Sequence, residues 1–219
     1  MNDFEKINSP FVRELRPEGY IVTSKIADDM AWVFTDESVI ASEKLHGTCS
    51  AVVIENGVVV AMFNRTARIP FIGKGRSKTF TEAVNNAIEK DRLILQDGIV
   101  WGEIIGPTLN GNPYMLEQHE FLPFDWIKEH LRYKSWGKYP KTYEAISEWF
   151  KELQPLYCWK IHSKEKADAS PEYAFVEGIV FHHQDGRMAK LRKDMFCWWK
   201  GAHRHKEEPL SIALFAKNQ

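Results

Sequence analysis

The side chain with the clearest chemical potential is that of Lys44, in the hexapeptide EKLHGT at positions 43–48. A lysine followed by glycine three residues later is common, and its plain interpretation is a surface ammonium on a turn. To act as a nucleophile the amine must lose a proton, because free lysine has a pKa of about 10.4. A dry pocket with cations nearby would lower that pKa. Gly47 would let a ligand approach the backbone without meeting a Cβ atom.

Two carboxylates interrupt apolar sequences that are typical of strands. Glu103 lies in WGEIIG at positions 101–106, and Glu177 lies in FVEGIV at positions 175–180. A carboxylate in such a strand is costly unless it is paired, binds a metal or faces water. Strand alternation could turn either one to solvent. Because both adjoin a glycine and β-branched residues, the pattern favours a ligand-binding role.

Two cations stand two positions apart in MAKLRK at positions 188–193. Residues i and i+2 of a strand share one face, so Lys190 and Arg192 would point the same way. Together they could clamp a polyphosphate. The alternative is a basic strand edge, which discourages aggregation. The pair alone does not decide between these two readings.

Hairpins are predicted on both sides of the candidate residues. Two β-branched runs at positions 50–55 and 58–63 flank an Asn-Gly pair, which is the strongest short-range hairpin signal. Lys44 would lie just before this hairpin, at the end of a short strand. A second hairpin is predicted to join residues 176–182 to residues 187–191. This second hairpin would carry the cation pair.

Other segments predict helices and one more strand. Residues 98–105 indicate a buried strand that carries Glu103, and the apolar spacing of residues 79–95 and 143–153 indicates helices. Residues 163–171 indicate a polar connector, and residues 193–215 are expected to end in a helix. The layout is α+β, with antiparallel hairpins and interspersed helices. The chain has no GxxxxGK[ST] loop, which argues against a P-loop nucleotide site.

Composition limits the class of protein. The 219 residues carry a net charge of −1, so any contact with a polyanion must come from local basic segments, such as residues 65–78 and 200–206. From charge alone, solvated loops are the plainer interpretation of both segments. The three cysteines form no CxxC pair, which argues against a disulfide framework or a zinc site. We find neither a signal peptide nor an apolar run of about 20 residues, and we expect a cytoplasmic setting.

Together these segments resemble the ordered motifs of the covalent nucleotidyltransferases: DNA ligases, RNA ligases and mRNA capping enzymes. The sequence is most similar to the second type of phage RNA ligase and its kin, the kinetoplastid RNA-editing ligases, whose lysine motif reads EKxHGT. DNA ligases and capping enzymes usually have aspartate at the position of His46. The matches run from about residue 39 to residue 196, and beyond Lys44 they fall on Arg65, Glu103, Phe124, Glu177, Lys190 and Arg192.

The resemblance implies a fold and a setting. The fold would be a nucleotidyltransferase, ATP-grasp-like ligase core of antiparallel sheets with flanking helices. Residues 1–219 would form a single adenylyltransferase domain, with neither an OB-fold nor a separate C-terminal domain evident. A phage-encoded relative would act in the host cytoplasm.

The resemblance also implies roles in nucleotide binding. Lys44 would attack the α-phosphate of ATP and form lysyl-AMP. Glu103 would bind the ribose, and Phe124 would stack on the adenine. Arg65 would contact the ribose or an RNA 5′-phosphate. The predicted nucleotide-binding set also includes Glu43 and Gly47, which lie before and after Lys44 in the hexapeptide. We call residues 45–47, which follow Lys44, the signature turn.

The remaining roles concern metal, phosphate charge and RNA. Glu177 would hold Mg²⁺ or Mn²⁺, because such ions pair few carboxylates with substrate phosphates. Lys190 and Arg192 would neutralise charge on the α-phosphate. With Lys44 these three residues form the predicted catalytic set. AMP would pass to an RNA 5′-phosphate, and an RNA 3′-hydroxyl would then seal the strand and release AMP.

Two departures leave alternatives open. The family usually has lysine at both positions of its last motif, whereas this chain has Arg192, and Lys193 could fill that place if the register slips. Many relatives carry a further C-terminal domain that engages RNA. The chain is therefore a minimal ligase aided by residues 200–206, a truncated domain, or a protein that needs a partner for RNA binding.

Three other readings compete with RNA sealing. They are a polynucleotide 5′-adenylyltransferase, a DNA ligase acting on nicks, and a catalytically inactive nucleic-acid-binding protein. His46 argues against the DNA ligase. The intact set of lysines and carboxylates argues against the inactive protein. The RNA substrate, whether a nick, a single-stranded break or a tRNA fragment, is not specified by the sequence, and neither is the oligomeric state.

Overall fold

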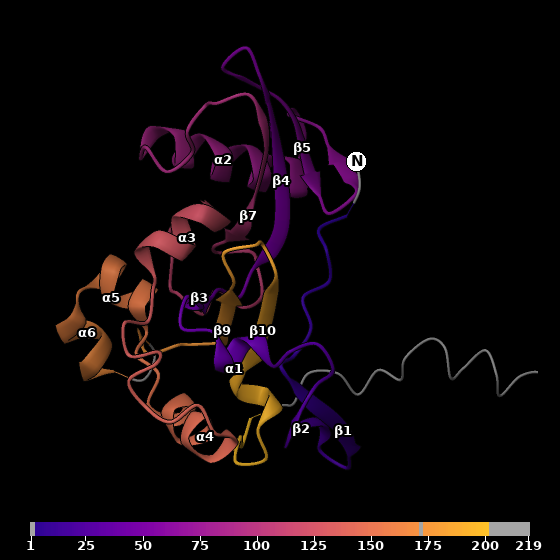
Figure 1. Ribbon diagram of the computed structural model, residues 1–219. Coiled ribbons are helices and arrows are strands. Elements are labelled where there is room, and N and C mark those ends of the chain that lie inside the picture. Colours follow the sequence, from indigo (N-terminus) through magenta and orange to yellow (C-terminus); the bar gives the residue numbers. More distant parts are fainter. Residues whose placement is uncertain (1–2, 171–172, 202–219) are drawn as a thin grey trace, which may run out of the picture.

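The computed structural model describes residues 3–170 and 173–201. It shows an upper part built on a five-stranded sheet and a lower part built on a three-stranded sheet (Figure 1). Both sheets are antiparallel, and helices pack around them. The expected α+β class is therefore confirmed. The helix predicted within residues 193–215 falls mostly outside the described residues.

The upper sheet has the strand order β6-β5-β4-β7-β8. Its strands are β4 (Thr48–Glu55), β5 (Val58–Asn64), β6 (Ala67–Ile69), β7 (Gly98–Ile105) and β8 (Glu120–Pro123). The predicted first hairpin is confirmed, because β4 and β5 pair around Asn56 and Gly57, whose φ angles are 52° and 73°. Positive φ at both positions is what a tight two-residue turn requires. The hairpin begins four residues after Lys44, as expected.

One helix covers the upper sheet, and its bounds differ from those predicted. Helix α2 (Arg76–Glu89) buries Phe80 and Val84 against Val52 and Ile104 of the sheet. It begins after Gly75, earlier than the predicted Thr79 start, and it ends before residues 90–95. Apolar spacing located the buried face of the helix. The first turn of the helix, residues 76–78, contains no apolar residue, so the apolar spacing could not show where the helix begins.

The lower sheet has the strand order β10-β9-β3 and brings distant segments together. Its strands are β3 (Ile40–Lys44), β9 (Gly178–His182) and β10 (Met188–Arg192). Lys44 pairs with Gly178, which in turn pairs with Arg192. The second predicted hairpin is therefore confirmed. It places one end of β10 level with the candidate nucleophile.

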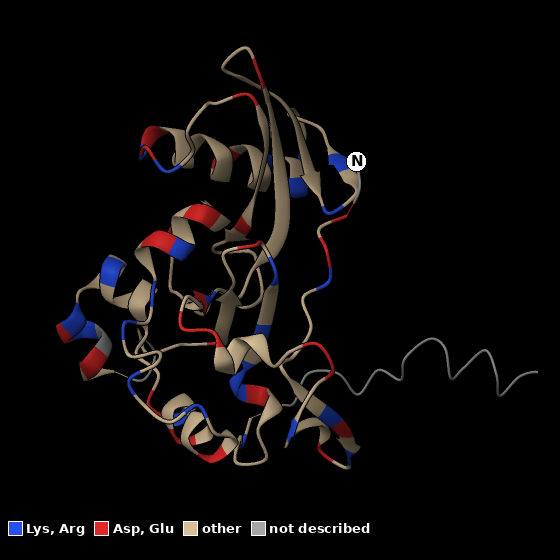
Figure 2. Ribbon diagram, in the orientation of Figure 1, with Lys and Arg blue, Asp and Glu red and all other residues tan. Residues whose placement is uncertain are grey.

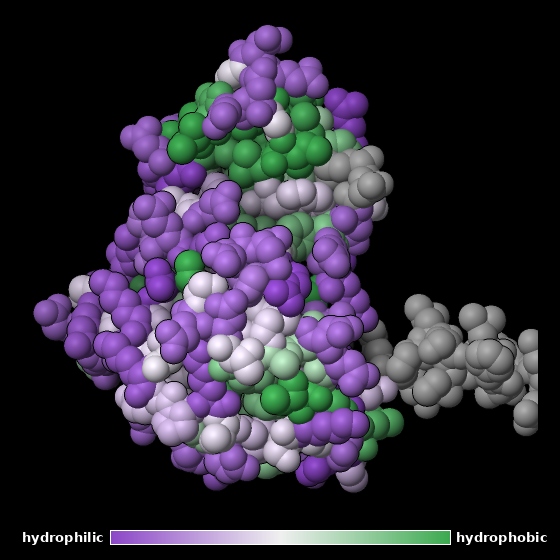
Figure 3. Space-filling model, in the orientation of Figure 1, coloured by the Kyte–Doolittle hydropathy of each residue, from purple (hydrophilic) through white to green (hydrophobic). Residues whose placement is uncertain are grey.

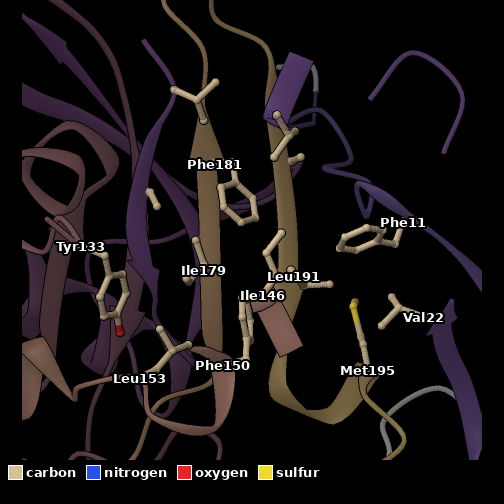
Figure 4. Close-up of a cluster of buried hydrophobic side chains, with 14 of the residues drawn as sticks. Phe11, Val22, Tyr133, Ile146, Phe150, Leu153, Ile179, Phe181, Leu191 and Met195 are labelled. Atoms are coloured by element: carbon tan, nitrogen blue, oxygen red, sulfur yellow. The ribbon is translucent and has the colours of Figure 1, made fainter. Parts of the chain in front are cut away.

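The main core lies against one face of the lower sheet (Figure 4). The side chains of Ile179, Phe181 and Leu191 point into this core and are fully buried. They pack against Ile146 and Phe150 of helix α4 (Tyr143–Lys151). The Thr142 hydroxyl caps α4 by accepting a hydrogen bond from the Ala145 amide. Because side chains alternate along a strand, the opposite face of the sheet carries Lys44 and Lys190. The core thus fixes the strands whose other face bears the candidate residues.

Several smaller elements complete the fold. They are β1 (Phe11–Arg16), β2 (Gly19–Ile26), α1 (Trp32–Thr35), α3 (Phe124–His130), α5 (Leu156–His162), α6 (Lys164–Ala169) and the 3-10 helix η2 (Lys193–Met195). The polar connector predicted for residues 163–171 was wrong over α6. Lysine, glutamate and alanine favour helix, and the Ser163 hydroxyl accepts a hydrogen bond from the Lys166 amide at 3.5 Å. Polarity alone had suggested a loop.

Charge and apolar surface are distributed differently. Lysine and arginine alternate with acidic residues over much of the view in Figure 2. Figure 3 shows apolar surface at the top of the molecule, over the region of α2 and the β4–β5 hairpin. A shallow groove of about 300 Å³ lies there, lined by Val58, Phe71, Ile88 and Leu95 among others. Within the described ranges, no helix is long and apolar enough to cross a membrane.

Candidate active site

A cleft of about 690 Å³ lies between the two sheets. Its walls come from the turn after β3, from β7 of the upper sheet, from β9 and β10 of the lower sheet, and from residues 4–7 near the N-terminus. Every residue predicted for the site lines this cleft: Glu43, Lys44, Gly47, Arg65, Glu103, Phe124, Glu177, Lys190 and Arg192. The fold therefore gathers residues that are up to about 150 positions apart in the chain.

Lys44 and Glu177 form an ion pair in the cleft. The Lys44 Nζ atom donates a hydrogen bond to Glu177 Oε2 at 2.8 Å and another to its neighbour's carbonyl, Leu45 O, at 3.1 Å. The side chains are 20% and 8% exposed, so the pair is largely shielded from water. At a distance of 2.8 Å in such surroundings, the attraction exceeds that of a surface pair. The amine is thereby held in a fixed place.

A glycine next to Glu177 makes this arrangement possible. A Cβ atom on Gly178 would lie 2.2 Å from Leu191 O and 2.6 Å from Arg192 Cα. Only glycine therefore lets β10 pair so closely with β9 at this point. The close pairing sets Arg192 level with Lys44 across the sheet.

His46 packs beside the ion pair. Its Nδ1 atom lies 3.5 Å from Glu177 Oε2, and its ring centroid is 5.8 Å from that of Phe175. Its backbone amide donates to the Tyr114 hydroxyl at 2.7 Å. These contacts hold His46 in place beside the Lys44–Glu177 pair.

Gly47 and Glu103 join the signature turn to the upper sheet. The Gly47 amide donates to Glu103 Oε1 at 3.0 Å. A Cβ atom on Gly47 would lie 2.2 Å from Ile104 O and 2.8 Å from Glu103 Cγ. The glycine thus permits the turn to rest directly on β7. In this structure the carboxyl of Glu103 is held by the turn itself.

The two carboxyls of the cleft have opposite pKa shifts. Burial raises the pKa of Glu103 to about 7, and the charge of Glu177 adds to this rise while Lys44 opposes it. Burial also acts to raise the pKa of Glu177, but the contacts with Lys44 and His46 outweigh it and bring the pKa to about 2. At neutral pH the cleft therefore holds one firmly ionised carboxylate and one that is close to its titration point.

Lys190 and Arg192 share the cleft face of β10, as predicted. Burial lowers the pKa of Lys190 to about 8, helped by the nearby charges of Lys44 and Arg192. The guanidinium of Arg192 has its Nε atom 3.0 Å from Asp194 Oδ1. Three cations so close together form a receptor for an anion.

Lys193 does not take the place of Arg192 on this face. Its backbone amide donates to Glu177 O at 2.9 Å, and the charge that acts on its side chain is that of Glu43. Lys193 is also absent from the residues that line the cleft. Of the two alternatives raised by the sequence, the geometry favours Arg192.

The carboxyl of Glu43 is engaged on the other side of β3. Glu43 Oε2 accepts a hydrogen bond from the Tyr157 amide of α5 at 2.8 Å, and the residue is 1% exposed. Its Oε1 atom is buried and has no hydrogen-bond partner among the described residues. Burial raises its pKa to about 8. A nucleotide contact of this carboxyl remains a prediction, and its bond to α5 favours a structural role.

The N-terminal strap, residues 3–8, forms a wall of the cleft that the sequence did not indicate. The Phe4 ring packs on Phe124 at a centroid distance of 5.0 Å and on Trp101 at 5.2 Å. Farther along, Asn8 O accepts a hydrogen bond from the Lys190 amide at 2.8 Å. The strap therefore runs from the upper sheet to the lower one along the cleft.

Arg65 lies at the upper end of this strap. It follows β5 with a φ of 53°, and its Nη1 atom is 3.2 Å from Asp3 Oδ2. The side chain is 65% exposed, so this ion pair is weak and can exchange partners easily. Arg65 is accordingly free to meet an anionic ligand at the cleft mouth.

Sequence reasoning missed the residues that brace the signature turn. Tyr114 accepts from the His46 amide, and its carbonyl lies 2.7 Å from His162 Nε2. Asn110 Nδ2 donates to Gly47 O at 2.8 Å. The sequence NGNPY at positions 110–114 offered a signal, since such clusters favour turns. It gave no sign of which segment the turn would contact.

Three further residues near the cleft, His182, His183 and Cys49, can be assigned to a position and a contact. His182 Nε2 lies 2.8 Å from Ser42 Oγ in the cleft wall, whereas His183 Nε2 lies 2.7 Å from Asp36 Oδ2 on the other side. The two rings cannot serve one metal. Cys49 lines the cleft, and burial raises its pKa to about 12. A thiol with such a pKa is a poor nucleophile at neutral pH.

The donor set fits a hard divalent cation shared with a ligand. Among residues 3–170 and 173–201, no group of three His, Cys, Asp or Glu side chains is placed to hold a metal alone. Glu177 and Glu103 offer carboxylate oxygens from opposite walls of one cleft. Mg²⁺ and Mn²⁺ suit such sites, because phosphates and water supply the remaining ligands.

A comparison with protein-family models supports the RNA ligase part of the resemblance seen in the sequence. The model of the family described as RNA ligase matches residues 37–198, which includes every residue predicted for the site. A search of curated proteins found no match.

Solved structures of Naegleria gruberi RNA ligase are similar at low sequence identity. A mutant with ATP and Mn is 15% identical, with a TM-score of 0.43 over 85% of this chain and 59% of that one. A structure with PPi is 16% identical, with a TM-score of 0.42 over 86% of this chain and 60% of that one. The chain thus spans less than two thirds of the length of these structures.

Proposed function

The chain belongs to the RNA ligase family, and we propose that it is an ATP-dependent RNA ligase in which Lys44 becomes covalently adenylylated. One observation carries the proposal. The Lys44 amine is fixed at 2.8 Å from Glu177 in a cleft that also gathers Glu103, Lys190 and Arg192. A nucleophile, two carboxyls and two further cations are the parts that nucleotidyl transfer at phosphorus requires.

In the first step the Lys44 nitrogen attacks the α-phosphorus of ATP. A nitrogen–phosphorus bond forms, the bond from that phosphorus to the bridging oxygen breaks, and pyrophosphate leaves. The ammonium must first give up a proton to solvent, while Glu177 Oε2, in direct contact with the amine, stays ionised and holds it in place. Lys190 and Arg192 would balance the charge that develops on the α-phosphate.

The other cleft residues would orient the nucleotide. Glu103 would accept a hydrogen bond from a ribose hydroxyl in place of the Gly47 amide, and Phe124 would stack on the adenine. Glu177 would hold a Mg²⁺ or Mn²⁺ ion. When bound, that ion would supply positive charge to the phosphates and compete with the ammonium for the carboxylate.

Two further transfers would complete strand sealing. An oxygen of an RNA 5′-phosphate would attack the lysyl-AMP phosphorus, which breaks the nitrogen–phosphorus bond and returns the lysine. An RNA 3′-hydroxyl would then attack the activated 5′-phosphate and release AMP. We place the chain in the branch of the second type of phage RNA ligase, as one nucleotidyltransferase domain with an ATP-grasp-like core. The EKLHGT hexapeptide supports this placement.

Label transfer from ATP tests the first step. The purified chain is incubated with Mg²⁺ and with ATP labelled at either the α- or the γ-phosphate, then denatured and separated by electrophoresis. We expect α-label on the protein and no γ-label. Lys44→Ala and Lys44→Arg should both abolish the label. Because arginine can keep the ion pair with Glu177, a folded Lys44→Arg variant separates loss of the nucleophile from loss of the fold. Label retained in either variant would refute the assignment.

End joining then separates the competing activities. The same preparation is given 5′-phosphorylated RNA, DNA and hybrid nicks, each with a 3′-hydroxyl. RNA sealing is expected, and accumulation of adenylylated RNA ends without joining would instead identify an adenylyltransferase. Preference for an all-DNA nick would overturn the RNA assignment while leaving the lysine chemistry intact.

A further inference from the structure

A second cavity, of about 870 Å³, lies next to the edge of the lower sheet. We call it the basic groove. Four of its lining residues are cations, namely Arg132, Lys134, Lys138 and Lys141, and one is an acid, Glu37. It shares no lining residue with the cleft. Such an excess of cations in a hollow favours an anionic ligand.

The backbone ties this groove to the strand that carries Lys44. The Glu43 amide donates to Leu131 O at 2.9 Å, and the Tyr133 amide donates to Ala41 O at 2.8 Å. An antiparallel bridge between Ser42 and Arg132 lies between these bonds. Residues 131–133 therefore lie antiparallel beside β3, joined to it by this single bridge.

This pairing turns Arg132 toward the cleft side of the sheet. Residues directly opposite each other in an antiparallel pair share a face, so Arg132 lies on the face of Ser42 and Lys44. Its Cα is on the order of 8 Å from that of Lys44, from one strand spacing and two residues of rise. Arg132 thus lies between the cleft face that carries Lys44 and the groove, whose other lining residues include Ala41 and Tyr133 of the opposite face.

Aromatic rings alternate with the cations in this segment, RYKSWGKYPK at positions 132–141. Tyr139 is 58% exposed. Trp136 is half-buried and has Lys141 Nζ at 5.2 Å from its ring centroid. Tyr133, by contrast, points into the core and donates to Gln154 O. Tyr139 is therefore the ring available for stacking, and Trp136 is part of the groove wall.

We propose that the basic groove binds a single-stranded segment of the RNA substrate next to the end being joined. Phosphates would lie along the cations, and an unpaired base would stack on Tyr139. A positively charged groove combined with an exposed ring is the common way to hold single strands without reading sequence. The proposal rests on the RNA ligase function proposed above, and it adds a binding site to it.

Binding of RNA in the absence of ATP tests the groove without relying on catalysis. The probe is a fluorescent, 5′-phosphorylated single-stranded RNA of about 12 nucleotides, within the site sizes of roughly 4–16 seen for single-strand binders. The test variant is Lys134→Glu/Lys138→Glu in the full chain. The matched control is Lys164→Glu/Lys166→Glu on α6, which changes the net charge equally.

We expect the groove variant to bind this RNA at least about tenfold more weakly, with a log affinity that depends less steeply on log salt concentration. If two phosphate contacts are lost, the slope should fall by about 1.4. Tyr139→Ala should weaken binding without changing that slope, since stacking carries no charge. The control should bind as the wild type does.

Equal binding by the groove variant and the wild type would overturn the inference, as would equal weakening in the groove variant and the control. Self-adenylylation without RNA should be unchanged in all variants, because the groove lies outside the cleft. A wild type that binds RNA through the groove but takes no label from ATP would refute the proposed function and leave the groove intact.

Discussion

The two walls of the cleft supply one carboxyl each, and the surroundings of these carboxyls differ. Glu177, from the lower sheet, meets the Lys44 ammonium at 2.8 Å and has its pKa lowered to about 2. Glu103, from the upper sheet, accepts a hydrogen bond from the Gly47 amide and forms no ion pair with any residue that the structure describes, and burial raises its pKa to about 7. Both lie in similar apolar sequences. The partner, more than the burial, decides which carboxyl stays charged.

The difference between the two pKa values suggests that the two carboxyls have different functions in the cleft. A carboxylate that is always ionised can hold a cation in place, whether the lysine or a metal. A carboxyl near its titration point can accept or donate a hydrogen bond as the ligand demands. If this comparison is right, the two glutamates should respond differently to the same substitution.

The largest effect is expected for Glu177→Gln. Removing the charge opposite Lys44 leaves a shielded ammonium without its partner and weakens any metal binding. We expect self-adenylylation to fall by about 10²–10³-fold, the usual loss when a preorganised electrostatic group is removed. Single-turnover label transfer from ATP measures it. A loss below tenfold would mean that Glu177 matters little for the chemistry.

The second-largest effect is expected for a substitution of Gly178, which follows Glu177 in the lower wall of the cleft. A Cβ atom in Gly178→Ala would collide with Leu191 O at 2.2 Å, and this atom belongs to a paired strand that cannot swing away. Overpacking of this kind typically costs about 1–3 kcal/mol. Thermal unfolding should show a lowered Tm. As a comparison, Gly186→Ala meets no atom within 4 Å but has a φ of 94°, so any loss there would report backbone strain alone.

The third prediction uses the pH dependence of stability. Glu103 has a folded pKa near 7 against an ordinary value of 4.5, so its stabilising contribution is complete below 4.5 and is lost as pH rises through 7. Glu177 shows the reverse: its contribution is present above 4.5 and is lost as pH falls toward 2.

Denaturant unfolding of the two glutamine variants at about pH 5 and pH 8 checks these signs. Relative to wild type, Glu103→Gln should gain stability on going from the lower to the higher pH. Glu177→Gln should be less stable than wild type at both. Parallel curves for the two variants would contradict the assigned difference between the walls.

The smallest effect is expected for Glu43→Gln. The side chain is bound to the Tyr157 amide on the far side of β3, and its raised pKa of about 8 leaves it mostly uncharged at neutral pH. Glutamine keeps the acceptor, so neither the fold nor label transfer should change measurably. A large loss of label transfer with an unchanged Tm would instead restore the nucleotide contact expected from the sequence.

Much of the site was predictable because its signals are local. The Asn56-Gly57 turn marked the first hairpin, and the apolar, glycine-adjacent surroundings of Glu103 and Glu177 marked these two carboxyls as candidates. The face shared by Lys190 and Arg192 followed from strand alternation alone.

The contacts that complete the site were not predictable, because they depend on distant segments. Nothing in the spacing of Phe4 or Tyr114 shows that they meet Phe124 and the signature turn. The segment 131–133 carries no strand pattern of its own and is extended only because β3 lies beside it. Such pairings follow from tertiary packing, which local periodicity cannot report.

The contact between Phe4 and Phe124 has a consequence for how the proposed nucleotide would enter the cleft. Ring centroids 5.0 Å apart leave no slot for a purine, which needs about 7 Å between two flat neighbours at ordinary carbon–carbon contact. A base that reaches Phe124 on that side must displace Phe4 or stack on one of its faces. Trp101, which touches Phe4, would sense that exchange as a change in its fluorescence. Trp101 would thus report whether a base has displaced Phe4 from Phe124.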